Sequence, residues 1–196
     1  MKEVTRRTQM KAERRRQLVH AATRLFAERG FRAVSMEDLA AEAGVSGPAV
    51  YRHFASKEAL LADLLIDVSR QLLEQGTERS KAPSPADALR LLISFHTDFA
   101  LRDRDLIRIQ DHDFANLAAE DARTVSRLQR DYLEVWIGVL RQIDSALSES
   151  VARTKIQAVF GLLNSTPHSA SHRDTEITRA ILEAMAMDAL GFALTP

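Results

Sequence analysis

Two short helical segments, about 35–43 and 46–53, follow each other with only Gly44 and Val45 between them. Apolar residues recur at helical spacing in both segments, and each has room for only about two turns. Two short helices joined by a tight turn that contains glycine form a helix-turn-helix motif. This connection constrains the chain more than any other feature of its sequence.

Residues at the starts of both segments support the same interpretation. Ser35 occupies an N-cap position with Asp38 three residues later, which is a variant of the capping box. Ser46 can cap the second helix, and Pro48 falls in its first turn, where a missing N–H costs little.

Longer helices are predicted on both sides of the motif. Lys11–Arg29 has an apolar stripe that Gly30 ends, and a fourth helix begins after Ser56 and ends before Gly76. The segment Gly76–Pro85 is rich in turn formers and is interpreted as a linker. Five further helices are expected at about 85–101, 104–116, 120–147, 150–165 and 173–192.

No segment alternates as a strand does, so the sequence predicts an all-α fold of about nine helices. We expect a basic N-terminal arm at 1–11, a helix-turn-helix domain at 12–58 and a larger helical domain at 59–196.

Net charge divides the chain into two parts. Residues 1–57 hold 12 Lys or Arg and 6 Asp or Glu, whereas the remainder holds 15 and 21. Basic side chains crowd the first 16 residues, where a mobile arm can follow phosphates, although a solvated tail is an equal alternative. The basic part is therefore the candidate nucleic-acid face.

The second helix of the motif begins with small residues, Gly47, Pro48 and Ala49, which allow its backbone to approach DNA in a major groove. Tyr51, Arg52, His53 and Lys57 follow, and their side chains can donate to phosphates or base edges.

The stretch from Arg14 to Leu60 resembles the DNA-binding domain of the tetracycline-repressor (TetR) family of bacterial regulators. The matching positions are Phe26, Gly30, Ser35, Leu39, Ala40, Gly44, Val45, Ser46, Val50, Tyr51, His53, Phe54, Lys57 and Leu60. The resemblance implies that Ser35, Ser46, Gly47, Tyr51, His53 and Lys57 touch DNA, with Tyr51, His53 and Lys57 on phosphates. Arg52 is a base-reading candidate.

Two of these residues have structural alternatives. Tyr51 can be a packed aromatic with its hydroxyl in water, and His53 can bond a terminal carbonyl at a helix end. Six apolar members of the matching set are assigned to the core: Phe26, Leu39, Ala40, Val50, Phe54 and Leu60.

For the larger domain the resemblance implies an effector pocket and a dimer interface made by the last two long helices, about 150–165 and 173–192. Val151, Ile156, Val159, Phe160 and Leu163 are expected to contact the partner, together with one of two apolar lines on the last helix.

Polar residues on apolar stripes, the apolar residues that share those stripes, and an aromatic and aliphatic line that can wall a cavity identify candidate effector ligands. The candidates are His96, Phe99, Gln110, Phe114, Tyr132, Trp136, Leu140, Phe160 and Asn164. The alternative for each of them is an ordinary core or surface residue whose polar groups, if any, find their hydrogen-bond partners within the protein or in solvent. The stretch 107–140 is similar to family members that control fatty-acid, acyl-CoA or sterol catabolism, which favours a largely apolar effector. A metal at His96, Asp98 and 111–113 is the weaker alternative to charged loop ends.

Enzyme motifs are missing: the chain has no cysteine, phosphate-binding glycine loop or nucleophile-elbow serine. We expect a cytoplasmic, homodimeric regulator that binds a palindromic operator in double-stranded DNA and is released by a small-molecule effector, with no cofactor, metal or membrane segment. Repression is the family's commoner mode. The alternative is a non-enzymatic helical interaction module with a basic arm.

Overall fold

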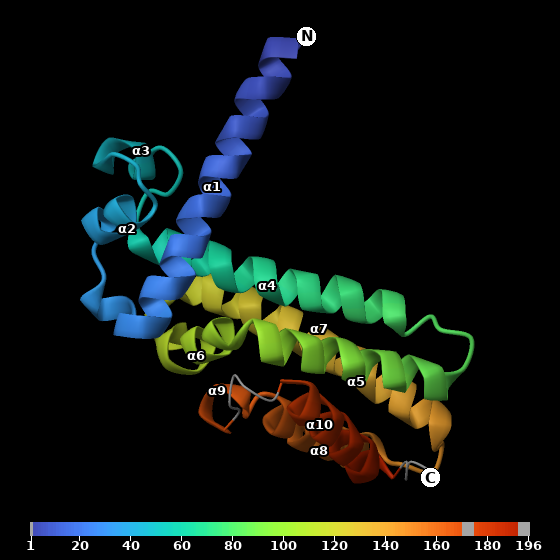
Figure 1. Cartoon of the computed structure of the whole chain (residues 1–196). Helices are drawn as coiled ribbons and strands as arrows, with labels where there is room; N and C mark the ends of the chain where they lie inside the picture. The colour runs from blue at the N-terminus through green and yellow to red at the C-terminus, as the bar shows by residue number, and fades with distance from the viewer. Residues whose placement is uncertain (1, 170–174, 192–196) are drawn as a thin grey trace. The chain divides into compact units, whose positions relative to one another are not determined.

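The computed structural model describes residues 2–169 and 175–191 (Figure 1). Its helices are α1 (Lys2–Arg29), α2 (Met36–Glu42), α3 (Gly47–Tyr51), α4 (Lys57–Arg79), α5 (Pro85–Arg102), α6 (Arg104–Asp113), α7 (Ala119–Ile143), α8 (Glu149–Leu163), α9 (Thr166–Ser169) and α10 (Thr175–Leu190), with 3-10 turns η1 (Phe31–Ala33) and η2 (Phe114–Asn116). No strand occurs in these two ranges, which confirms the all-α prediction.

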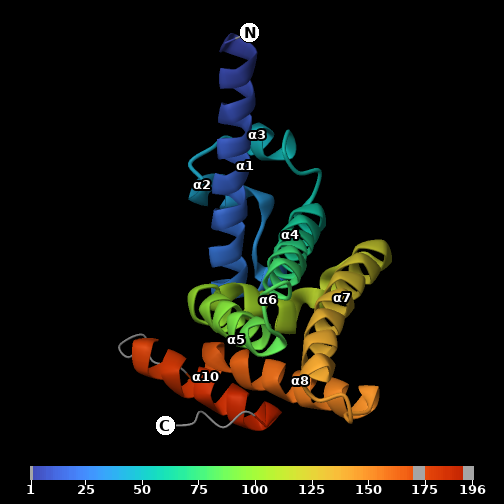
Figure 2. The same ribbon diagram turned by 90° about the vertical axis from the view of Figure 1, so that its right-hand side faces the viewer.

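The chain forms two compact units, whose boundaries in the sequence fall within α4, α6 and α7. The first unit comprises Met1–Asp67 and Arg108–Arg123, and the second comprises Val68–Ile107 and Thr124–Pro196. In the first unit α2 contacts both α1 and α3, and the N-terminal turns of α1 extend past them (Figures 1 and 2).

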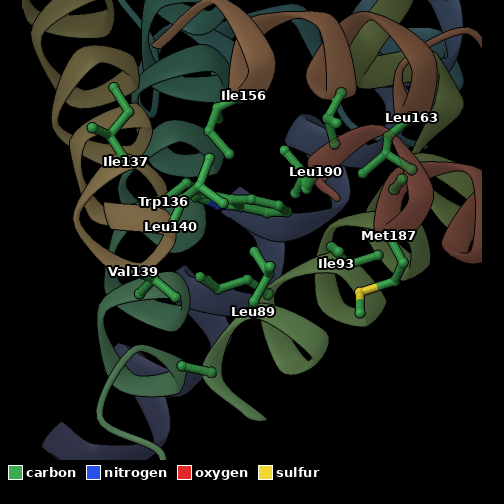
Figure 3. Packing of buried hydrophobic residues seen from close by; sticks show 14 of the residues in the cluster. Leu89, Ile93, Trp136, Ile137, Val139, Leu140, Ile156, Leu163, Met187 and Leu190 are labelled. Atoms are coloured by element: carbon green, nitrogen blue, oxygen red, sulfur yellow. The ribbon is translucent and has the colours of Figure 1, made fainter. Parts of the chain in front are cut away.

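The second unit is built on α10, which lies against α5 and α8. Figure 3 shows the indole of Trp136 at the centre of its core, among Leu89, Ile156 and Leu190. Each of these four side chains is at most 3% exposed. Burying a side chain of this size contributes about 1.5–3 kcal/mol, so helices α5, α7, α8 and α10 are held together mainly by this core.

The first helix is longer than its apolar stripe predicts. α1 begins at Lys2 rather than near Lys11, so the backbone of the predicted arm is helical from its second residue. The prediction for the last helix included residues 173, 174 and 192, which lie outside the described ranges.

The prediction that the fourth helix ends before Gly76 is wrong. α4 continues through Gly76 to Arg79, and the turn before α5 comprises residues 80–84. Ser84 caps α5 by accepting from the N–H of Asp87 at 3.1 Å. Gly76 has a packing role in place of the expected stop signal.

Candidate functional site

The helix-turn-helix has the local structure that its sequence predicts. The hydroxyl of Ser35 accepts from the N–H of Asp38 at 3.0 Å, and the Asp38 carboxylate accepts from the N–H of Ser35 at 2.8 Å. The Ser35 hydroxyl also donates to the Asp38 carboxylate at 2.6 Å, and this hydrogen bond, together with the one from the Ser35 N–H, lowers the pKa of Asp38. Gly44 adopts a φ of +62° in the turn, a conformation that favours glycine. Ser46 takes the N-cap position of α3, but its side chain makes no capping hydrogen bond.

Three consecutive residues at the end of α3 face solvent to different degrees. Tyr51 is 52% exposed and Arg52 is exposed, whereas His53 is half-buried. Tyr51 therefore does not pack in the core, which removes the structural alternative for its ring. Val50 and Phe54, on either side, are buried. The core residues hold α3 in place while Tyr51 and Arg52 remain available to a partner.

A groove of about 660 Å³ lies between α1 and α3, within the first unit. It is lined by Lys11, Arg14, Gly44, Val45, Ser46, Ala49, Arg52 and His53, and we call it the basic groove. Burial lowers the pKa of His53, and the nearby cations Lys11, Arg52, Arg14 and Arg15 lower it further. The groove thus presents a positive surface beside the exposed end of α3. Its lysine and arginine side chains carry the charge, and the lowered pKa favours the neutral form of His53.

Lys57 has a structural role that its sequence position does not reveal. Its ammonium donates to the carbonyl oxygens of Phe31 at 2.8 Å and Val34 at 2.7 Å. It also lies 4.3 Å from the centroid of the Phe31 ring. These contacts attach the start of α4 to the segment before α2. A phosphate contact by Lys57 stays a prediction. A phosphate bound there would have to share the Lys57 ammonium with the two carbonyl oxygens.

A buried carboxylate supports the same segment. Both oxygens of Asp113 accept from the N–H of Phe31 at 3.3 Å, and Asp113 is 7% exposed. Asn116 donates to the backbone carbonyl of Asp113 at 3.2 Å. Residues 113–116 thereby belong to the first unit together with the helix-turn-helix.

In the second unit, His96 is the centre of a buried polar and aromatic cluster. Its Nδ1 lies 3.2 Å from the Tyr132 hydroxyl, and its Nε2 lies 3.1 Å from Oδ1 of Asn164. With the amide oxygen as acceptor, neutral His96 donates from Nε2 and accepts the Tyr132 hydroxyl proton at Nδ1. Burial lowers the pKa of His96 to about 4 and raises the pKa of Tyr132.

Aromatic rings enclose this pair of hydrogen bonds. The Phe160 ring stacks on His96 with centroids 4.9 Å apart and an angle of 11° between the planes. Trp136 meets His96 edge-on at 5.9 Å, and Phe99 lies 5.7 Å away. We call this set the His96 cluster: His96, Phe99, Tyr132, Trp136, Phe160 and Asn164. No member carries a charge when His96 is neutral.

Six of the nine candidate effector ligands therefore meet in one place, although they come from three different helices and a helix end. Leu140 is completely buried in the adjoining hydrophobic core. Gln110 and Phe114 belong to the first unit and are half-buried there. Trp136 Nε1 is buried and makes no hydrogen bond of ordinary length and angle among the described residues, although its N–H interacts with the Tyr132 hydroxyl and opposes the rise in the pKa of that group.

The predicted dimer helices differ in how much apolar surface they leave exposed. On α10, Ile177 is 62%, Ile181 52% and Met185 48% exposed, whereas Leu182, Ala186 and Leu190 are buried. The two apolar lines predicted for this helix thus separate only in their larger side chains, because Ala184 of the first line is half-buried and Ala189 of the second is exposed. Among the large apolar side chains of α8, only Val151, at 45%, is exposed to a comparable degree.

The expectation that Ile156, Val159 and Leu163 contact a partner is wrong. All three are at most 1% exposed within the single chain. They pack in the second unit's own core, against α10 and α5 among others. Phe160 belongs to the His96 cluster.

Sequence reasoning missed several residues that the structure brings to these sites. Lys11 and Arg14 were counted only as part of a basic run, but their spacing of three places them on one face of α1. Nothing in the sequence distinguishes the packing role of Gly76 from a helix stop signal. Likewise, nothing distinguishes the buried role of Asp113 from that of a charged residue at a loop end.

Two other features of the described residues bear on function. No helix among them is both long enough and apolar enough to cross a membrane. Within the same ranges no three or more His, Asp or Glu side chains are grouped so that they could hold a metal ion.

Comparisons with known proteins match both parts of the chain. Residues 18–64 match the family model described as bacterial regulatory proteins, tetR family, and residues 82–168 match a tetracyclin repressor-like C-terminal domain. The HTH-type transcriptional repressor KstR2 of Rhodococcus jostii is 31% identical over 137 residues, 68% of this chain and 66% of that relative. The alignment thus spans just under two thirds of the relative.

Solved structures share the fold along nearly the whole chain. A TetR-family transcriptional regulator from Bordetella parapertussis superposes with a TM-score of 0.82 at 22% identity, covering 93% of this chain and 96% of that one. The regulator FadR from Bacillus subtilis, solved with stearoyl-CoA, has a TM-score of 0.68 at 22% identity over 87% and 96% of the two chains. Because models of one family match its two successive parts, the chain belongs to the tetR family of bacterial regulatory proteins.

Proposed function

We propose that the chain is a cytoplasmic transcription regulator that binds a palindromic operator as a homodimer and is released by a largely apolar effector. One observation carries the DNA-binding part most directly. Tyr51 and Arg52 project into solvent from a helix-turn-helix whose neighbouring residues Val50 and Phe54 are buried. The remaining predicted contacts are Ser35, Ser46, Gly47, Pro48, Ala49, His53 and Lys57.

Repression is the mode we propose, because KstR2, the relative aligned above, is described as a repressor. Two recognition helices in successive major grooves would lie about 34–36 Å apart, and an effector that prefers another spacing would release the DNA. The proposal assigns no catalytic step to the chain.

The exposed line Ile177, Ile181 and Met185 of α10, with Val151 of α8, supports a dimer contact through these two helices. Apolar side chains at this spacing form a stripe along one helix face, and a second copy would cover it. The interface we propose is narrower on α8 than the sequence indicates, because most apolar residues of α8 are already buried.

For the effector we propose a lipid-related molecule with a neutral polar group, such as an acyl thioester. The His96 cluster is apolar apart from uncharged hydrogen-bonding groups, so a buried carboxylate would have no counter-ion there. The indole N–H of Trp136 makes no hydrogen bond of ordinary length and angle, only a weaker interaction with the Tyr132 hydroxyl, so it can donate to a carbonyl oxygen. Stearoyl-CoA is bound by the structurally similar FadR.

Selection from a random-sequence duplex library with the purified full chain tests the DNA-binding part. We expect enrichment of a palindromic site that binds one dimer and resists random competitor DNA. If no sequence is enriched and all binding disappears at moderate salt, the regulator proposal fails and a basic interaction module becomes the better explanation.

The selected duplex then tests the effector. Stearoyl-CoA is expected to release the DNA, whereas coenzyme A alone leaves it bound. Trp136→Phe keeps an aromatic ring but removes the donor, so it should weaken release by stearoyl-CoA and leave the affinity for DNA unchanged. Equal release in the variant and the parent chain would remove Trp136 from the effector site.

A further inference from the structure

The basic groove combines positive charge from two elements that are far apart in the sequence. Lys11 and Arg14 come from α1, and Arg52 and His53 lie at the end of α3. The hydroxyl of Ser46, which makes no capping hydrogen bond, also lines the groove. A phosphate needs such a set of convergent donors with net positive charge.

Among the residues whose side chains the structure describes, no acidic group lies in this surface. Arg15, the next cation on α1, is paired with Asp63 and lies 3.7 Å from Asp67, both on α4. Arg14 donates to Gln17 at 3.0 Å, which is an uncharged partner. No acidic residue lines the basic groove itself.

We propose that the basic groove holds one DNA backbone phosphate between α1 and α3, and that His53 takes up a proton when the phosphate enters. This inference rests on the proposed DNA-binding function and deepens it in two ways. It adds Lys11 and Arg14 to the contact residues, and it makes DNA binding sensitive to pH.

Electrostatics gives the direction of the proton uptake. In the free chain, His53 is half-buried beside Lys11, Arg14, Arg15 and Arg52, so the protonated imidazole is disfavoured and its pKa is lowered. A phosphate in the groove offsets the repulsion from these cations and accepts a hydrogen bond from the imidazolium. The complex then binds more protons than the free chain, so affinity for DNA rises as the pH falls.

A matched set of charge variants tests the groove. Lys11→Gln and Arg14→Gln remove one charge each from it. Arg16→Gln removes the same charge from another face of α1, where Arg16 is 73% exposed, pairs with Glu13 and lines a separate depression. Affinity for the selected duplex is measured with each full-length variant over a range of salt concentrations.

Lys11→Gln and Arg14→Gln should each weaken binding and reduce the salt slope by about one per protomer, whereas Arg16→Gln should change both much less. Equal effects of Arg14→Gln and Arg16→Gln would overturn the groove as a phosphate site. If the parent chain binds no duplex even at low salt, the proposed DNA-binding function itself fails, which is a distinct result.

The histidine arm measures the titration in the parent chain itself and uses His53→Gln only to assign the signals. The imidazole signals of His53, assigned by their loss in His53→Gln, are titrated by NMR without and with the duplex. We expect the pKa of His53 to rise in the complex, and the affinity to increase by up to about tenfold per pH unit per protomer between the pKa of the complex and the lower pKa of the free chain, which lies below 6.5.

His20→Gln is the matched control for the pH profile, because His20 is an exposed residue of α1 that lines the other depression. It should keep the parent pH dependence, whereas His53→Gln should flatten it. An unchanged pKa of His53 in the complex would overturn the proton uptake. If inorganic phosphate at the same phosphate concentration raises the pKa as much as the duplex does, the groove is a small-anion site and the assignment to DNA is wrong.

Discussion

The Cα of Gly76 in α4 lies directly against the ring of Tyr132 in α7. A Cβ at position 76 would come within 2.3 Å of Cε2 and 2.9 Å of Cδ2 of that ring. Contacts this short do not occur between real atoms, so any larger residue would displace Tyr132. The same ring donates its hydroxyl to His96. The close approach of α4 to α7 at this point therefore positions one partner of the His96 cluster.

Gly76→Ala is expected to destabilise the second unit by about 1–3 kcal/mol, because the methyl group forces Tyr132 out of its position. Gly138→Ala in α7 is the matched control: it also lies within a helix, but a Cβ there meets nothing within 4 Å. That change should stabilise the chain by up to about 1 kcal/mol, since alanine is the better helix former. Denaturant unfolding followed by the fluorescence of Trp136, the single tryptophan, compares the two variants. Equal stability of both would contradict the packing role of Gly76.

Gly76 also illustrates where prediction from the sequence ended. Glycine, proline and serine around residues 76–85 are typical of a linker, whereas the contact with Tyr132, 56 positions later, explains why a glycine stands inside the continuing helix. The helix-turn-helix was predictable because Ser35, Asp38 and Gly44 act on their immediate neighbours. Capping and turn formation depend on neighbouring residues, whereas the packing of the Tyr132 ring against Gly76 is a long-range contact.

The candidate effector residues show the same distinction. His96 and Asn164 were recognisable as polar groups on apolar stripes and Tyr132 as part of an aromatic line, and the structure places Tyr132 and Asn164 within hydrogen-bonding distance of His96. Helical periodicity indicated which face each residue occupies, but it carried no information on which helices pack together. The assignment of Ile156 and Val159 to a dimer contact failed for that reason, because either a partner or the chain's own core can cover an apolar face.

Stability of the second unit should decline as the pH falls from about 6.5 to about 4. His96 has a folded-state pKa of about 4, below the ordinary value of 6.5, so the unfolded chain binds more protons in this window. Its contribution is fully present above the unfolded-state pKa and decreases by at most about 1.4 kcal/mol per pH unit below it. Below about pH 4 the contribution of His96 no longer changes.

Urea unfolding at several pH values, again followed by Trp136 fluorescence, measures this dependence. His96→Gln should show a shallower dependence than the parent chain, because a glutamine does not titrate. His112→Gln serves as the control, since His112 is exposed. Identical slopes for His96→Gln and the parent chain would mean that His96 is not the group responsible.

Asp113→Ala is expected to destabilise the first unit by about 1–3 kcal/mol, because the buried N–H of Phe31 loses its acceptor. Asp113→Asn keeps one oxygen that can accept from this N–H, so its effect should be smaller. Thermal unfolding of both variants, followed by circular dichroism, measures the difference. The hydrogen bond is not the cause if the two substitutions destabilise the chain equally.

Tyr51→Phe and Lys57→Met separate a DNA contact from a structural one. Tyr51 is 52% exposed, so removing its hydroxyl should leave the melting temperature unchanged. If the hydroxyl binds a phosphate, its loss weakens operator binding by about 0.5–1.5 kcal/mol, which is roughly twofold to tenfold. Lys57→Met leaves the carbonyls of Phe31 and Val34 without their donor, so it should lower the melting temperature as well as the affinity.

Anisotropy with the selected duplex, measured beside the melting curves, distinguishes these outcomes. An unchanged affinity in Tyr51→Phe would exclude its hydroxyl from the interface, and an unchanged melting temperature in Lys57→Met would show that the two carbonyl contacts contribute little to the fold.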